Sequence, residues 1–299
     1  MKFPHIAFAT PRRLPKPADL VGRVAVLDIA FAAGKGRQSF TQVTRRFIEG
    51  LGDRLAVWID HHDHIMHKKY ADDDRFVLRS KDEHHACPEM VTRERIEKAG
   101  PVDTICCHTD FDGLCSAAKW IRRGIEPYPG ADLDARMIDT RLGQPSERAT
   151  TIDRSLRARP NDEMLRGLIL RFLANGCDDV DSYRVLKKNA EQLAPREAQA
   201  RELAKGFVVK NSVAVVRFGR VENPYDKTTL LLIGQQLAPI SVVCDQTTVT
   251  VATRFDSGIN LLKILDLQGG MPTVVSLAAK DFETVVNTLG WNQTSSPAL

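Results

Sequence analysis

Residues 102–117, VDTICCHTDFDGLCSA, decide how the first half of the chain folds. The largely apolar run 102–107 has the length of a buried strand, and it ends at three chargeable side chains, His108, Asp110 and Asp112. A glycine and a series of small residues follow and predict a helix. A strand that runs directly into a helix is typical of a parallel sheet.

Three further segments show a related pattern. The run 21–29 (VGRVAVLDI) contains Asp28 near its end, and the run 54–59 (RLAVWI) leads into Asp60, His61 and His62. The shorter run 136–139 (RMID) is a fourth candidate strand and ends at Asp139. Continuous apolar strands separated by helices predict an α/β fold with a parallel sheet covered on both faces.

The length of 299 residues suits two domains. We expect residues 1–177 to form the first α/β domain. Residues 178–206 are charged and rich in alanine, lack a strand pattern, and predict a helical connector. Residues 207–299 return to alternating strands and helices, which predicts a second, smaller α/β domain; its last residues, 292–299, we expect to be frayed.

The composition is that of a soluble globular protein, with 43% hydrophobic and 27% charged residues. A net charge of +4 permits an anionic substrate but does not by itself indicate nucleic-acid binding. The six cysteines form no CxxC pair, and no apolar stretch is long enough to span a membrane. These features favour a cytoplasmic protein with free thiols and no membrane partner.

The polar residues at the strand ends are the candidate site. In an open α/β sheet, ligands bind beyond the carboxyl ends of the strands. Many carboxylates in a partly desolvated cleft require cations to compensate their charge. Mixed oxygen and imidazole ligands favour Mn²⁺, with Mg²⁺, Co²⁺ or Fe²⁺ as weaker alternatives. Two such metals held about 3.5–4 Å apart activate water and neutralise phosphate in many phosphoester-cleaving enzymes.

Each of these residues also has a structural explanation. An aspartate at a strand end is often a helix N-cap, an alternative that applies to Asp28 and Asp139. The cluster 60–64 can be a solvated loop, and His108 with its two aspartates can be a set of hydrogen-bonded buried groups. Four further histidines of this half are expected at the surface and not as ligands: His64, His67, His84 and His85.

Two of these motifs resemble those of the DHH phosphoesterase superfamily: Asp60-His61-His62 after an apolar strand, and His108-Thr109-Asp110-Phe111-Asp112-Gly113. That superfamily includes RecJ-type exonucleases, oligoribonuclease/pAp phosphatases, cyclic-dinucleotide phosphodiesterases and family II pyrophosphatases. The resemblance covers about residues 21–145. The order differs from the usual one, in which the His-x-Asp-x-Asp motif comes first, so the strands look circularly permuted around one site.

The resemblance implies roles for individual residues. One metal would be bound by Asp28, His108 and Asp110. The second would be bound by Asp28, His61, Asp112 and, as the least secure ligand, Asp139. Asp28 would bridge both metals, Asp60 would orient His61 or touch a metal, and His62 would face the scissile phosphate as a catalytic residue together with Asp60.

The last third resembles the DHHA1 substrate-binding domain that usually accompanies such a site. Arg254 matches a phosphate-binding arginine, and Gly269 and Gly270 match a glycine-rich turn. Met271 stands where that family has a histidine, which puts the usual recognition of a terminal nucleotide in doubt. An ordinary helix–strand turn is the alternative for the glycine pair.

The sequence therefore favours an enzyme, a metal-dependent phosphoesterase that hydrolyses nucleotides or short single-stranded oligonucleotides. Aromatic residues make up only 6% and do not gather with basic residues, so a long single-strand track is not expected. A polyphosphate or pyrophosphate hydrolase and a non-catalytic nucleotide sensor are the alternatives. The sequence leaves open whether the chain is a monomer or a homodimer.

Overall fold

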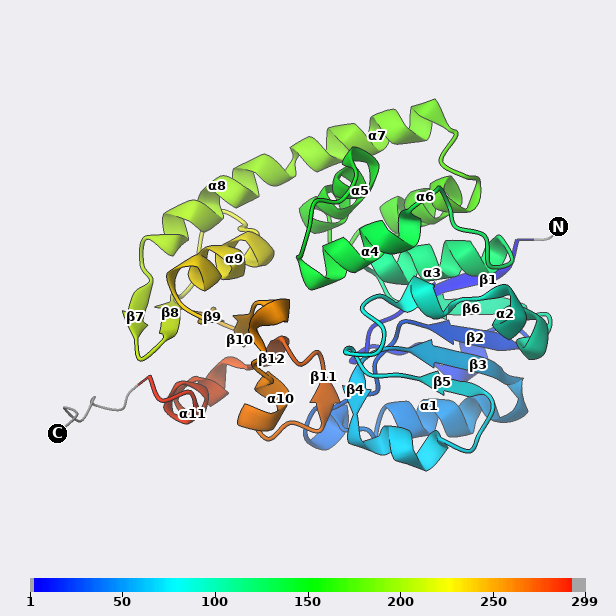
Figure 1. Ribbon diagram of the computed structural model, residues 1–299, viewed down its shortest axis with the longest axis horizontal. Helices are drawn as coiled ribbons and strands as arrows, with labels where there is room; N and C mark the ends of the chain where they lie inside the picture. Colours follow the sequence, from blue (N-terminus) through cyan, green and yellow to red (C-terminus); the bar gives the residue numbers. More distant parts are fainter. Residues whose placement is uncertain (1–2, 292–299) are drawn as a thin grey trace. The chain divides into compact units, whose positions relative to one another are not determined.

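The structure is a computed structural model that describes residues 3–291. The tail 292–299, expected to be frayed, lies outside the described residues. The chain divides into two units: the first comprises residues 1–191 with Gln268–Gly270, and the second comprises Gln192–Leu267 and the residues from Met271 onward. Each unit has its own five-stranded central sheet, so the fold is a mixed α/β fold built on two main sheets (Figure 1).

The first unit is built on a five-stranded sheet in the order β1-β6-β2-β3-β5, and every neighbouring pair is parallel. Its strands are β1 (His5–Phe8), β2 (Val24–Leu27), β3 (Leu55–Asp60), β5 (Phe76–Leu78) and β6 (Thr104–Cys107). Its helices are α1 (Thr44–Leu51), α2 (Arg93–Ala99), α3 (Phe111–Ile121), α4 (Ala131–Thr140), α5 (Glu147–Ala158), α6 (Glu163–Ala174) and α7 (Val180–Glu191).

Both faces of this sheet are covered, which confirms the expectation from the continuous apolar strands. Along β2, Ala25 and Leu27 pack into a core with residues of α3 to α7, whereas Val24 and Val26 pack into a second core with residues of α1. Alternate residues of a strand point to opposite faces, so an apolar residue at every position fills both cores.

The prediction of a strand at residues 136–139 is wrong, because these residues lie in the C-terminal part of α4. Ala131, Ala135 and Ile138 are buried along one side of this helix at the spacing of helical turns. A run of only four residues is too short to show the helical repeat, so its periodicity cannot distinguish a helix from a strand. Asp139 therefore lies on a helix and not at a strand end.

The second unit contains a five-stranded sheet in the order β12-β10-β9-β8-β7, in which β8 and β9 are parallel and the other pairs are antiparallel. Its strands are β7 (Val208–Lys210), β8 (Val213–Arg217), β9 (Ile240–Cys244), β10 (Thr248–Thr253) and β12 (Val274–Ala278). Its helices are α8 (Leu193–Ala204), α9 (Lys227–Leu237), α10 (Leu261–Ile264) and α11 (Phe282–Thr288).

A short antiparallel pair joins β4 (Asp63–His64) to β11 (Gly269–Gly270). The predicted turn at Gly269–Gly270 is therefore a two-residue strand that belongs to the first unit. A Cβ atom on Gly269 would lie 2.3 Å from Cδ2 of His64 and 2.6 Å from the carbonyl oxygen of Asp63. Only glycine allows this close approach of the two backbones. Between residues 3 and 291, no helix is long and apolar enough to cross a bilayer.

Candidate metal centre

The candidate site lies beyond the carboxyl ends of three adjacent strands, β6, β2 and β3. Asp28 directly follows β2. Asp60 is the last residue of β3, and His61 and His62 come next in the sequence. His108 directly follows β6. The structure thus brings the motifs together at one edge of the sheet, although they are separated in the sequence.

The loop after β6 is shaped by the start of α3. Asp110 is the N-cap of this helix, and its Oδ1 accepts a hydrogen bond of 3.2 Å from the amide of Gly113. A Cβ atom on Gly113 would lie 2.7 Å from Cβ of His108, so the close return of the helix to the strand end requires glycine here. All residues of α3 except Ile121 are buried, which holds Asp112 in place in the first turn.

Asp28 is the central residue of the site. It is fully buried and has a φ of 59°, in the left-handed region that few residues other than glycine adopt. Its Oδ1 lies 3.2 Å from Nε2 of His61, and its Oδ2 lies 3.7 Å from Nδ1 of His108. Within residues 3–291, neither oxygen takes part in a hydrogen bond of acceptable geometry. A strained, buried carboxylate without a hydrogen bond is a feature of functional sites.

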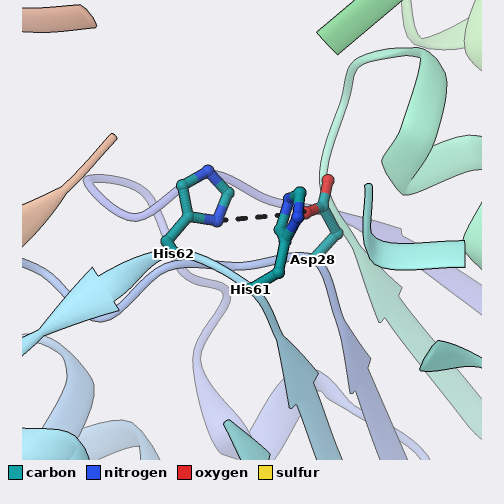
Figure 2. Close-up of side chains that lie close together, drawn as sticks. All are labelled: Asp28, His61 and His62. Atoms are coloured by element: carbon teal, nitrogen blue, oxygen red, sulfur yellow. Dashed lines mark ion pairs between the residues drawn. The ribbon is translucent and has the colours of Figure 1, made fainter. Parts of the chain in front are cut away.

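Three groups of side chains place their donor atoms within 4.8 Å of one another, as required to hold a metal ion. Figure 2 shows the side chains of one group converging beyond the ends of β2 and β3. The groups are Asp28, His61 and His62; Asp28, His108 and Asp110; and His61, Asp112 and Asp139. All six metal ligands that the resemblance implies are members of these groups.

The carboxylates and imidazoles perturb one another strongly. Burial raises the pKa of Asp28 well above its usual value, and the neighbouring Asp112 and Asp110 raise it further. Burial opposes protonation of His61, but Asp112 and Asp28 overcome it and raise the pKa of His61 to about 10. Burial likewise opposes protonation of His108, and Asp110 raises its pKa to about 10. The site therefore attracts positive charge.

The ring of His61 is oriented by a hydrogen bond to the backbone of His84. Its Nδ1 lies 2.9 Å from the carbonyl oxygen of His84, which can only accept a hydrogen bond. Nδ1 therefore carries a proton and Nε2 faces Asp28 and Asp112, at 3.2 and 3.4 Å. A metal-binding histidine commonly donates its other N–H to a carbonyl oxygen in this way.

Asp60 contacts His62, whereas the resemblance implied His61 or a metal as its partner. Oδ1 of Asp60 lies 2.8 Å from Nδ1 of His62. Burial lowers the pKa of His62 although Asp60 raises it, so the imidazole is held in its neutral form at neutral pH. Asp60 thus fixes the orientation of the His62 ring.

Lys81 also lies at the site, with a side chain that is 1% exposed, although its position in the sequence did not predict this. Its Nζ lies 3.2 Å from Nε2 of His61 and forms an ion pair with Oδ2 of Asp139. Burial lowers the pKa of Lys81, and Asp112 and Asp28 oppose this effect. In the sequence, Lys81 stands in the polar stretch Ser80–His85, where a lysine is expected to be solvated. No pattern in that stretch distinguishes it.

Two other expectations concern residues around the site. His64 is buried and not at the surface, because its ring packs against Phe31 and Phe40, each at a centroid distance of 5.6 Å.

Arg254 lies in the second unit, where its guanidinium forms two hydrogen bonds with Asp256 beside a cavity of about 660 Å³. Gly269 and Gly270 belong to the first unit, so the three substrate-binding candidates do not share one unit.

Comparison with protein-family models gives no match, and no curated protein matches the chain. Among solved structures, the fold is similar to a pGpG-specific phosphodiesterase, PggH from Vibrio cholerae, with a TM-score of 0.45 and 12% sequence identity. The similarity covers 90% of this chain and 97% of that chain.

Proposed function

We propose that this chain is a metal-dependent phosphoesterase that acts on nucleotides or short oligonucleotides. The observation that carries this proposal is the position of Asp28, a buried carboxylate between His61 and His108 that has no hydrogen bond within the described part of the chain. The motifs that resemble the DHH phosphoesterases support the substrate class. A phosphate ester suits a site that attracts cations, because a bound cation attracts the anionic substrate.

The residues present fit a divalent metal. Nδ1 of His108 is buried and, like both oxygens of Asp28, has no hydrogen bond of acceptable geometry within residues 3–291. Asp28, His108 and Asp110 would supply two carboxylates and one imidazole, a donor set that suits Mn²⁺. A divalent cation bound there would neutralise phosphate charge and lower the pKa of a bound water.

His62 is the group that would handle a proton on the substrate. Its Nδ1 is held by Asp60, so Nε2 is left to donate to, or accept from, a phosphate oxygen or the leaving group. The ring is 17% exposed while Asp60 is fully buried, so the imidazole is accessible and its orienting partner is not. This pairing supports a catalytic role for His62 and a positioning role for Asp60.

The test is hydrolysis of a 5′-phosphorylated RNA dinucleotide by the purified protein with Mn²⁺. Asp110→Asn removes the charge but keeps an oxygen for the N-cap of α3, so the fold should persist while turnover falls at least a hundredfold. Asp162→Asn makes the same change at the N-cap of α6, outside the three groups, and should leave turnover unchanged.

Pyrophosphate and a cyclic dinucleotide serve as parallel substrates. Turnover of pyrophosphate alone would replace the proposal with an inorganic phosphatase. Metal binding without turnover of any phosphate ester would favour a nucleotide sensor. Turnover that is equal in wild type and Asp110→Asn would show that another site carries the activity.

A further inference from the structure

Lys81 lies inside one of the three donor groups. Its Nζ is 3.2 Å from Nε2 of His61 and 3.4 Å from Nδ1, and it forms an ion pair with Oδ2 of Asp139. His61 and Asp139 are two of the three members of the group that also contains Asp112. The lysine therefore contacts the same atoms that a metal in this group would use.

A divalent cation and an ammonium group cannot share these donors at close range. The lone pair of His61 Nε2 can face one of them, and the oxygen of Asp139 that would bind the metal is already paired. The two cations would also repel each other in a site from which water is largely excluded. Lys81 is fully buried along its whole side chain, so its charge is not screened by solvent.

The group formed by Asp28, His108 and Asp110 is different. Within residues 3–291, no lysine or arginine forms an ion pair with any of these three residues. Nδ1 of His108 lies 2.7 Å from Oδ2 of Asp110 and 3.7 Å from Oδ2 of Asp28. This group holds no lysine or arginine charge, whereas the group around His61 and Asp139 already contains the ammonium of Lys81.

We propose that the ammonium group of Lys81 replaces the second metal, so that the site binds one divalent cation on Asp28, His108 and Asp110. This inference rests on the proposed function and changes the expectation of two metals. Lys81 supplies a fixed positive charge on the side of His61 and Asp139. It does not activate a water as a metal would, so that task falls to the single cation.

The experiment counts the metals. The protein is dialysed to equilibrium against Mn²⁺, and bound manganese is measured by elemental analysis together with the electron paramagnetic resonance spectrum. Wild type should bind one ion per chain and show the signal of an isolated Mn²⁺. Lys81→Met, which keeps the length of the side chain but removes the charge, should bind two ions and show a coupled pair.

Lys119→Met is the matched control. Lys119 is also buried, at 8% exposure, and is paired with one aspartate, Asp132, outside the three groups. Its replacement should leave the count at one. Asp139→Asn in the wild-type background provides a second test if Lys81→Met fails to fold: a one-metal site keeps one ion, whereas a two-metal site loses one.

The outcomes separate this inference from the proposed function. Two ions in the wild type, or one ion in a folded Lys81→Met variant, would overturn the role of Lys81 and leave a metal-dependent site in place. No bound ion in the wild type would contradict the proposed function itself. One ion in wild type that becomes two in Lys81→Met would support the role of Lys81 and the presence of a metal site, on which the proposed function depends.

Discussion

Asp28 directly follows strand β2, and His61 directly follows the adjacent strand β3. Oδ1 of Asp28 lies 3.2 Å from Nε2 of His61. Residues 33 positions apart in the sequence thus meet because parallel neighbouring strands end at the same edge of the sheet. Both side chains are fully buried, and Asp28 is also a member of the proposed metal site with His108 and Asp110.

Asp28→Asn should stabilise the metal-free protein and abolish metal-dependent stabilisation. A buried carboxylate that accepts no hydrogen bond of acceptable geometry is unfavourable, and asparagine tolerates the same left-handed backbone. We expect the free energy of unfolding in EDTA to rise by about 1–3 kcal/mol. Urea titrations with EDTA and with Mn²⁺ measure both effects. A variant that is less stable than wild type in EDTA would show that Asp28 is held by favourable contacts.

Gly113→Ala should displace the loop that carries His108. The added Cβ would lie 2.7 Å from Cβ of His108 and 2.9 Å from its carbonyl oxygen. We expect a destabilisation of about 1–3 kcal/mol and weaker binding of Mn²⁺. Gly167→Ala is the control on α6, where the nearest atom is the end of the Arg171 side chain at 3.5 Å. That change should stabilise the helix by up to about 1 kcal/mol. Equal effects of both changes would contradict the steric explanation.

Gly269→Ala should separate β11 from β4. Its Cβ would collide with the His64 ring, so the amide of Ile65 should lose its 2.9 Å hydrogen bond to the carbonyl oxygen of Gln268. Hydrogen exchange at Ile65 should become at least tenfold faster. Gly219→Ala, at a glycine with no atom within 4 Å of the added Cβ, should leave this exchange rate unchanged. Retained protection in Gly269→Ala would show that the pair tolerates a side chain.

The stability of the metal-free protein should fall between pH 6.5 and 4 because of His64. Burial lowers the pKa of His64 from 6.5 to about 4, so the unfolded chain binds this proton more readily than the folded one. The contribution of neutral His64 is complete above pH 6.5 and is lost as the pH falls toward 4, by up to about 3 kcal/mol.

Unfolding by urea in EDTA across this pH range measures that loss. His64→Asn keeps an acceptor near the amide of Met66 and cannot titrate, so its stability should depend less steeply on pH. An unchanged slope in this variant would assign the pH dependence to other groups.

The sequence pattern predicted the three central strands β2, β3 and β6. Their alternate residues fill the two cores on opposite faces of the sheet, so each strand is a continuous apolar run. The edge strands β1 and β5 were not predicted. They have only 4 and 3 residues, mostly half-buried, so they carry a weaker apolar pattern. The convergence of Asp28, His61 and His108 was predictable because these residues follow strand ends, where the topology brings them together.

Other features depend on contacts that no local pattern encodes. Lys81 reaches the site from an irregular segment, and its burial follows only from the packing of β3, α4 and the loop between β5 and α2. The pairing of Gly269 with His64 joins residues 205 positions apart. Asp139 lies in a donor group with His61 and Asp112 although the strand assigned to it was wrong.

The measurement that tests the central claim most directly is an anomalous difference map at the manganese edge from crystals grown with Mn²⁺. The account predicts a peak contacting Asp28, His108 and Asp110. A map with no peak at these three residues, in crystals that contain the ion elsewhere, would contradict it.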